Sequence, residues 1–306
     1  MSLTFSKTSP EDTMSSHGKS FYFASRFFSK NTMHKVATLY SFCRYIDDCA
    51  DELSPSISNE EILKIKRLIQ YPENHSELSL SIENIKNWGV QERNLLELID
   101  GALFDVHGGK IETEEELHLY CYLVAGVVGL MMCPLIGVRD QKASIHAVYL
   151  GMAMQLTNIC RDVLEDSLNG RCYLPESELR VHKVNIKSLE NTNSSANELR
   201  LIVLKYLDKA DQYYRIGYEG LSYIPFRPRL AILVAGEVYR HIGVKIKHQR
   251  FRFLKERTYL NTFEKILVVL KTSVFLFKPS FWSIKNKRNK QNDSLKFISL
   301  LNRFNT

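Results

Sequence analysis

The sequence predicts an all-α protein with one helical domain of roughly ten helices over residues 1–284, followed by a basic tail over residues 285–306. Three observations support this prediction. Gly and Pro, which interrupt helices, occur only 14 and 8 times in 306 residues. Apolar residues recur at helical spacing through most of the chain. No stretch alternates between apolar and polar residues for long, as strands of a half-buried sheet would.

The N-terminal third of the chain predicts three helical segments. Residues 9–12 (SPED) are typical of a helix start, with a capping Ser, Pro in the first turn and acids behind it. Residues 19–54 contain neither Gly nor Pro and predict a long helical segment that ends at Pro55 and a cluster of serines. Ser58 is expected to cap the next helix, which Pro72 closes.

The remainder of the chain continues the helical pattern. Residues 176–197 are polar and are expected to contain a loop, and residues 266–282 form an apolar stretch broken by two lysines and a proline. That stretch predicts a core helix, with a helix lying on a bilayer as the alternative. We expect no uncharged apolar run of about 18 residues, the length of a membrane span. Further helices are predicted over residues 91–107, 112–132, 140–166, 194–222 and 229–250.

Charge and cysteine content limit the function classes. The net charge is +7, with basic residues dense at 245–257 and 285–290, which suits a membrane surface, an anionic substrate or simply a solvated tail. No CxxC pair occurs and each cysteine has apolar neighbours, which predicts free thiols in a reducing compartment. Residues 1–16 lack the apolar core of a secretory signal, so we expect a cytoplasmic location. The cysteines are Cys43, Cys49, Cys121, Cys133, Cys160 and Cys172.

The stretch YSFCRYIDDCADE (40–52) crowds acids at the end of an apolar segment. Asp48 and Glu52 lie about 100° around the helix from a stripe that carries the other two acids. A solvated acidic face would be the ordinary explanation for such acids. A divalent cation with oxygen ligands would relieve the repulsion, and Mg²⁺ commonly binds carboxylates together with substrate phosphates. The stripe consists of Tyr40, Arg44, Asp47 and Asp51.

The stretch GMAMQLTNICRDVLEDSLNGRCYLP (151–175) places a polar stripe beside an apolar one on a single helix. A buried helix of this kind should face a polar cavity, because buried polar groups need partners; a water-facing side is the alternative. Arg161 and Arg171 can answer a diphosphate, and Tyr173 follows. The polar stripe carries Gln155, Asn158, Asp162 and Asp166, and the apolar stripe carries Met152, Leu156, Ile159 and Val163.

Two acidic pairs at i, i+4 spacing on different helices can face each other across a bundle. Such an arrangement predicts a polymetal clamp on diphosphate groups, in which the metal neutralises the leaving group of an allylic substrate. The carbocation formed needs a dry pocket, and 16 Phe and 15 Tyr supply apolar and aromatic material for one.

These stretches resemble the squalene and phytoene synthase family, the head-to-head prenyl synthases. The resemblance spans roughly residues 17–260 and is weaker in VYRHIGVKI (238–246) and ERTYL (256–260). The segments that carry it are HGKSFYFASRFF (17–28), LYSFCRYIDDCADE (39–52), YCYLVAGVVGL (120–130) and QLTNICRDVLEDSLNGRCYLP (155–175).

The resemblance implies an isoprenoid-synthase helical bundle around a central cavity and about three Mg²⁺ ions, or Mn²⁺ in their place. The implied metal ligands are Asp47, Asp51, Asn158, Asp162 and Asp166, and the four aspartates with Tyr120 are the implied catalytic residues. The implied substrate-binding residues are His17, Ser20, Tyr40, Arg44, Gln155, Arg161, Arg171, Tyr173 and Arg257, with a looser match at Tyr239.

The implied reaction joins two prenyl diphosphates head to head through a cyclopropylcarbinyl diphosphate, which rearranges to a 1-1′ linked chain. The GRCYLP ending favours two geranylgeranyl diphosphates and the product phytoene, in carotenoid biosynthesis. The alternative is a C30 product from two farnesyl diphosphates, with NADPH only in a squalene-forming member. Chain length would depend on pocket residues such as Phe21, Phe23, Ala125 and Val128.

Other classes remain as alternatives. DDCAD (47–51) also suits a chain-elongating prenyltransferase, but DVLED (162–166) replaces the second DDxxD. Asn158, Asp162 and Asp166 are spaced like the metal ligands of a terpene cyclase, against which CRDVLED and GRCYLP argue. A non-catalytic assembly factor is a further alternative, although both acidic pairs are intact.

The expected partners are the prenyl diphosphate substrates. We expect neither a nucleic acid nor an obligate protein partner. As a hypothesis, residues 266–290 contact the inner face of the membrane peripherally, because they combine apolar and basic residues.

Overall fold

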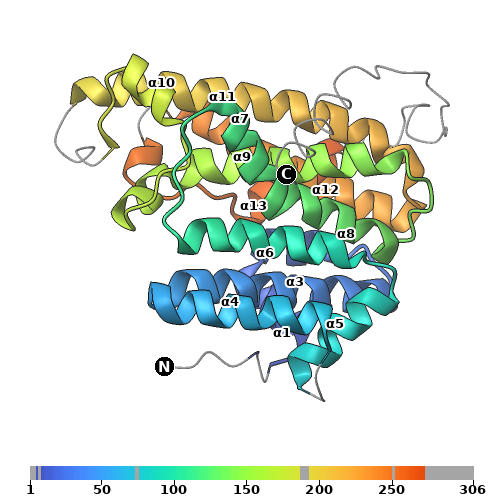
Figure 1. The fold of residues 1–306 in the computed structure, drawn as a ribbon. Helices are drawn as coiled ribbons and strands as arrows, with labels where there is room; N and C mark the ends of the chain where they lie inside the picture. The colour runs from blue at the N-terminus through green and yellow to red at the C-terminus, as the bar shows by residue number, and fades with distance from the viewer. Residues whose placement is uncertain (1–4, 6–7, 73–75, 187–192, 250–251, 273–306) are drawn as a thin grey trace.

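A computed structural model describes residues 5, 8–72, 76–186, 193–249 and 252–272, and these form a bundle of helices (Figure 1). Within these ranges the structure has α-helices, short 3₁₀ turns and one π-helical turn, and no strand, which confirms the predicted all-α class. The N-terminal helices are α1 (Pro10–His17), α2 (Lys19–Ser25), α3 (Lys30–Glu52), α4 (Pro55–Gln70), α5 (Glu77–Asn87) and α6 (Glu92–Val106). The later elements are α7 (Glu114–Cys121), η1 (Tyr122–Gly126), α8 (Val127–Leu135), α9 (Ala143–Leu168), α10 (Glu176–Val181), α11 (Asn193–Glu219), η3 (Gly220–Tyr223), α12 (Phe226–His248), η4 (Arg252–Leu254) and α13 (Thr262–Thr272).

The helix starts follow from capping chemistry. Ser9 accepts a hydrogen bond from the Asp12 backbone N–H at 3.1 Å, with Pro10 in the first turn, so α1 begins where the sequence predicts. At α7, Thr113 and Glu116 form a reciprocal capping box. The segment expected to be continuous over residues 19–54 is divided, because Ser29 caps a new helix, α3, by accepting from the Thr32 backbone N–H at 3.2 Å.

Several sequence expectations for the middle of the chain were wrong. Ser58 does not cap a helix; α4 begins at Pro55, and the buried Ser58 hydroxyl donates to the Cys49 carbonyl oxygen at 2.6 Å. No helix was expected at α5, where buried Leu78, Ile82 and Ile85 recur at helical spacing. The stretch 176–197 does contain irregular backbone, at 182–185, as expected, but it also holds the short helix α10 and the first turn of α11.

The central layer of the bundle is α9, which packs against α7, α8, α11 and α12. A second group of helices, α1, α4, α5 and α6, packs around α3, and α6 joins the two groups by also contacting α8 and η1. Figure 1 shows this division, with α3, α4 and α5 on one side and α9, α10 and α11 on the other. The cavity described below lies between α3 and α9.

The continuous helical segment α7–η1–α8 is unusually apolar. Residues 119–138 contain no charged side chain, so the expectation that no such run reaches the length of a membrane span was wrong. By length and composition, Glu114–Leu135 qualifies as a span, and 39% of its most apolar window is buried inside the protein. In the bundle it packs against α6 and α9, as a core helix does.

The C-terminal expectations are met only in part. Helix α13 covers the first part of the apolar stretch at 266–282, but the helix begins earlier, at Thr262. The predicted domain boundary at 284/285 and the basic tail lie outside the described residues. All six cysteines are free thiols, as predicted.

Two glycines bring α9 against η1 and α8. A Cβ on Gly151 would overlap the carbonyl oxygen of Ala125, and a Cβ on Gly129 would overlap that of Ala147. The backbones are therefore in direct contact, and a side chain at either glycine would separate the helices. This contact fixes the two walls of the cavity that α8 and α9 provide.

Replacing Gly151 by Ala should destabilise the protein, because the obstacle is backbone and cannot move aside. We expect the free energy of unfolding to fall by about 1–3 kcal/mol, the usual range for overpacking, measured by urea denaturation. The matched control is Gly243→Ala in α12, where the new Cβ would meet side-chain atoms instead of backbone, Leu207 at 3.2 Å and Thr157 at 3.8 Å. There a helix-propensity gain of about 1 kcal/mol offsets the contact. Equal stability of both variants would contradict the role of the α8–α9 contact.

Candidate active site

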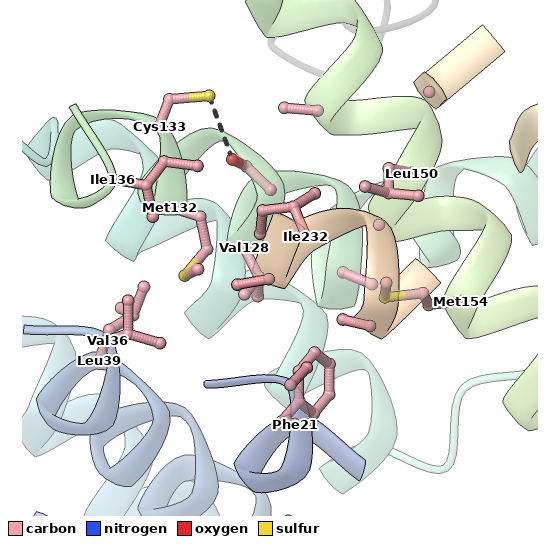
Figure 2. Close-up of a pocket in the computed structure, with 18 of the residues that line it drawn as sticks. Phe21, Val36, Leu39, Val128, Met132, Cys133, Ile136, Leu150, Met154 and Ile232 are labelled. Carbon is pink, nitrogen blue, oxygen red and sulfur yellow. Dashed lines mark hydrogen bonds between the residues drawn. The ribbon is translucent and has the colours of Figure 1, made fainter. Parts of the chain in front are cut away.

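An apolar cavity of about 270 Å³ runs between α3 and α9. Along α9 its lining extends from Ala143 to Asn158, roughly 22 Å at 1.5 Å per residue. Figure 2 shows Leu150 and Met154 of α9, Val128 and Met132 of α8 and Ile232 of α12 around this space. Such a lining excludes water and suits a long hydrocarbon chain.

One end of the cavity is polar. The side chains there are Tyr40 and Asp47 from α3, Gln155 and Asn158 from α9, and Tyr239 from α12. The Asn158 amide nitrogen donates to Gln155 Oε1 at 3.3 Å, while the Asn158 oxygen is buried without a hydrogen-bond partner. A buried oxygen without a partner is costly, so this end of the cavity offers an unused ligand atom.

The first acidic motif lies in the last turns of α3. Burial among protein atoms, and next the charge of Asp51, raise the pKa of Asp47 to about 7, although its side chain is exposed in the cavity. Arg44 forms an ion pair with Asp48 at 2.5 Å. It therefore neutralises the acid on the neighbouring face while still lying close enough to lower the pKa of Asp47.

The second motif is surrounded by arginines. Arg161 binds both oxygens of Asp162, at 2.7 and 2.5 Å, and Arg257 Nε approaches the same carboxylate at 3.0 Å. Arg257 also pairs with Glu165 at 3.4 Å. The structure thus places Arg257 beside the second motif, where the resemblance suggested it only loosely. Burial, followed by the charges of Asp162 and Glu165, raises the pKa of Asp166 to about 7.

Arg171 connects the two motifs. It follows α9, after Gly170 turns the chain at a φ of 74° that favours glycine. Its guanidinium group forms an ion pair with Asp51 of α3 and donates to the Ala50 carbonyl oxygen at 3.3 Å. The ends of α3 and α9 are therefore joined, and each motif contributes one residue, Asp47 or Asn158, to the lining of the cavity.

Asp105, which sequence reasoning missed, organises the aromatic residues of the site. It lies at the end of α6 and accepts hydrogen bonds from Tyr120 and Tyr173, each at 2.9 Å. The two rings stack with centroids 4.7 Å apart. Burial raises the pKa of Asp105 to about 6, while both tyrosine hydroxyls lower it. Its only sequence signal was an isolated acid near the end of an apolar helix.

The remaining expected residues lie at the rim and along the wall. His17 ends α1, and the next residue, Gly18, packs against the Tyr40 ring. Within the described ranges no ion pair or hydrogen bond joins His17 or Ser20 to the acidic residues. Phe21, Ala125 and Val128 line the cavity, as expected of residues that could set chain length.

Phe23 was wrongly grouped with these wall residues. It lies two positions from Phe21, which turns it to another side of α2. There the Lys265 ammonium lies 6.0 Å from the centre of its ring.

The arrangement can bind diphosphate at one end and hydrocarbon at the other. Carboxylate and amide oxygens at the polar end suit hard divalent cations, and Arg161, Arg171 and Arg257 suit phosphate oxygens. The apolar wall would protect a carbocation from water. These are the requirements for ionising an allylic diphosphate.

Comparisons with known sequences agree with this chemistry. The squalene/phytoene synthase family model matches residues 14–264. The chain is 32% identical over 268 residues to a 15-cis-phytoene synthase of Enterobacter agglomerans, covering 83% of this chain and 90% of that protein. It is 33% identical over 260 residues to a phytoene synthase of Thermus thermophilus, covering 83% and 88% of the two chains.

Solved structures show the same fold. A dehydrosqualene synthase crystallised with a ligand aligns with a TM-score of 0.77 and 25% identity, covering 87% of this chain and 95% of the other. The squalene synthase HpnC of Alicyclobacillus acidocaldarius aligns with a TM-score of 0.67 and 21% identity, covering 79% and 93%. Taken with the family match over residues 14–264, the chain belongs to the squalene/phytoene synthase family.

Proposed function

We propose that this protein condenses two geranylgeranyl diphosphates head to head into phytoene, by way of a cyclopropylcarbinyl diphosphate. The observation that carries the proposal is that each acidic motif supplies one residue, Asp47 of α3 and Asn158 of α9, to the same end of an apolar cavity, while Arg171 joins the ends of the two helices. The curated relatives at 32–33% identity are named phytoene synthases, which supports the C40 product.

The residues present fit magnesium ions. Hard oxygen ligands are available from Asp47, Asp51, Asn158, Asp162 and Asp166, and the unpartnered Asn158 oxygen is an unused one. Within the described residues no three acidic, His or Cys side chains converge as ligands; arginines hold Asp51 and Asp162 instead. When bound, magnesium would neutralise the diphosphate and favour departure of the leaving group.

The arginines serve the diphosphate in this proposal. Arg161, Arg171 and Arg257 each pair with a carboxylate of the site, so their guanidinium groups are already held at the polar end. When a diphosphate binds there, each guanidinium group exchanges carboxylate oxygens for phosphate oxygens. Guanidinium binds both kinds of oxygen equally well. The family resemblance adds His17, Ser20, Tyr40 and Arg44 as further substrate contacts, and of these Tyr40 lines the cavity.

The aromatic cluster serves the cation. Ionisation of the first substrate leaves an allylic cation, whose C1 the double bond of the second substrate attacks; loss of a proton closes the cyclopropane ring. Ionisation of that intermediate, rearrangement and a second proton loss yield the 1-1′ linked product without a reductant. The stacked rings of Tyr120 and Tyr173, fixed by Asp105, offer π-electron density to these cations.

A C30 product is the second candidate. It is favoured by the structural match to a dehydrosqualene synthase at a TM-score of 0.77. Both candidates use the same polar end of the cavity and differ in the hydrocarbon that its wall accepts. NADPH would be required only if the product were squalene.

Product identity separates the candidates. Purified protein with Mg²⁺ should convert geranylgeranyl diphosphate to a C40 hydrocarbon with the mass of phytoene, with or without NADPH, and should use farnesyl diphosphate poorly. Mass spectrometry of each reaction tests this. A C30 product as the main outcome would move the protein to the dehydrosqualene or squalene branch. No product from either substrate would favour the assembly factor.

Neutralising one acid of either motif should abolish most activity. We expect Asp47→Asn and Asp162→Asn each to lower kcat by about 100-fold or more, because the cluster loses a metal ligand. Thermal unfolding should stay close to that of the wild type. The matched control is Asp208→Asn on α11, an exposed acid paired with Lys247 at 2.5 Å, which should retain full activity. Near-wild-type rates in either motif variant would remove the metal clamp from the mechanism.

The raised pKa values of Asp47 and Asp166 predict how the metal-free protein responds to pH. Both values lie near 7, above the unfolded value of 3.8, so the folded chain holds protons that the unfolded chain releases. Stability contributed in this way is lost as the pH rises through about 7. The thermal midpoint in EDTA should therefore fall between pH 6.5 and pH 8, and this fall should be smaller in Asp47→Asn.

The pH interval and the controls make this test specific. Burial lowers the pKa of His118 from 6.5 to about 4, so its opposing contribution is already more than half gained by pH 6.5 and offsets only part of the fall expected from the two aspartates. Asp208→Asn should keep the wild-type slope, and Mg²⁺ with inorganic diphosphate should raise the midpoint most at pH 8. A thermal midpoint that rises from pH 6.5 to pH 8 would contradict the prediction.

A further inference from the structure

The outer face of α13 is apolar, although exposed helix faces are ordinarily polar. Phe263, Ile266, Leu267 and Leu270 recur at i, i+3, i+4 and i+7 and are 68%, 45%, 39% and 61% exposed. On the other side of the helix, Val268 and Thr272 are buried, and α13 packs against α12. The helix therefore has an apolar face toward the protein and a second apolar face that the described residues leave uncovered.

Helix α2 extends this face. It also packs against α12, and the contact of Lys265 with the Phe23 ring joins it to α13. Phe21, Tyr22 and, just after the helix, Phe27 are each more than a third exposed. The α2/α13 surface is defined here as Phe21, Tyr22, Phe27, Phe263, Ile266, Leu267 and Leu270. An exposed apolar patch of this kind marks an interaction site.

Cations border the α2/α13 surface. Lys19 and Arg26 lie on the α2 side, and Lys265 and Lys271 lie on α13. Within the described ranges none of the four pairs with a carboxylate, and the α13 acid Glu264 is taken up by Lys245 at 2.6 Å. Burial, and then the charge of Lys19, lowers the pKa of Lys265. Two ammonium groups held within electrostatic reach of each other favour an anionic ligand.

The cavity reaches the protein surface here. Phe21 lines the cavity and is 36% exposed, and Figure 2 shows it projecting from α2 toward Met154 and Val128. Its ring contacts two other lining residues, Tyr239 at 5.2 Å and Tyr40 at 6.3 Å between centroids. Phe21 therefore connects the α2/α13 surface with the cavity near its polar end, where Tyr40 and Tyr239 lie.

We propose that the α2/α13 surface docks on an anionic phospholipid bilayer. The aromatic and aliphatic side chains enter the interface, while Lys19, Arg26, Lys265 and Lys271 meet lipid phosphates. A second copy of the chain fits less well, because a two-fold contact would bring the same cations together. Docking would place the opening of the cavity against the bilayer, into which polyprenyl substrates partition. This advantage rests on the proposed function, whereas the docking itself is inferred from the surface alone.

Vesicle co-sedimentation of the full chain, without substrate or Mg²⁺, tests the proposal. The protein should bind vesicles of phosphatidylcholine and phosphatidylglycerol in equal parts more tightly than vesicles of phosphatidylcholine alone. Ile266→Glu/Leu270→Glu should weaken binding to the mixed vesicles by about tenfold or more, as loss of two buried apolar side chains implies. Lys19→Gln/Lys271→Gln should weaken binding by about fivefold per charge, and only on the anionic vesicles.

The matched control is Ile57→Glu/Leu80→Glu, which makes the same chemical change on α4 and α5. Ile57 and Leu80 are 43% and 46% exposed, and this variant should bind vesicles like the wild type. Circular dichroism melts verify that each variant is folded.

Wild-type vesicle binding by Ile266→Glu/Leu270→Glu would overturn the proposal. If Ile266→Glu/Leu270→Glu kept its vesicle affinity and also changed its oligomeric mass, the α2/α13 surface would be assigned to contact with a second copy of the chain. Activity on detergent-dispersed geranylgeranyl diphosphate should survive in this variant. An inactive wild type that still binds vesicles would count against the proposed function alone.

Discussion

Mutual repulsion among carboxylates at one end of the cavity is the constraint that the surrounding structure has to satisfy. Besides burial, the charges of Asp51 and Asp105 raise the pKa of Asp47, and those of Asp162 and Asp105 raise the pKa of Asp166. Asp51 and Asp166 also occupy the last turns of α3 and α9, where the negative end of the helix dipole disfavours acids. Arg161, Arg171 and Arg257 balance this charge. The site is therefore held together by its cations, and a divalent ion with diphosphate can take over the same task.

The apolar part of the molecule keeps that charged end in place. Helix α9 touches the backbone of η1 and α8 through Gly129 and Gly151, so direct backbone contact holds together the two walls that these helices provide. The π-helical turn η1 lies in this wall and contributes Val124 and Ala125 to the lining. π-turns are uncommon and are often found at functional sites. Close packing along the hydrocarbon wall thus supports a polar end at which the arginines can exchange carboxylate partners for a diphosphate.

Periodicity predicted the residues that share a helix, and capping chemistry predicted several helix starts. The polar stripe of α9 was recognised because Gln155 and Asn158 repeat at helical spacing, and both line the cavity. Asp105 could not be found in this way, because no second acid lies one turn from it on α6 and its partners, Tyr120 of α7 and Tyr173 beyond α9, come from distant parts of the chain. Phe23 was misplaced because composition does not tell which side of a short helix faces inward. The outward apolar face of α13 could not be predicted for a similar reason. The sequence shows an apolar stripe but does not show whether another helix packs against it.

Tyr120 and Tyr173 donate to the same acceptor, Asp105. Substitution of one tyrosine therefore has a different consequence from substitution of the aspartate. Removal of one phenol leaves the other with its hydrogen bond and leaves Asp105 with one donor. Removal of the Asp105 carboxylate leaves two largely buried hydroxyl groups without an acceptor at once. A change at one tyrosine therefore leaves the other hydrogen bond of the stacked pair in place, whereas a change at Asp105 removes both together.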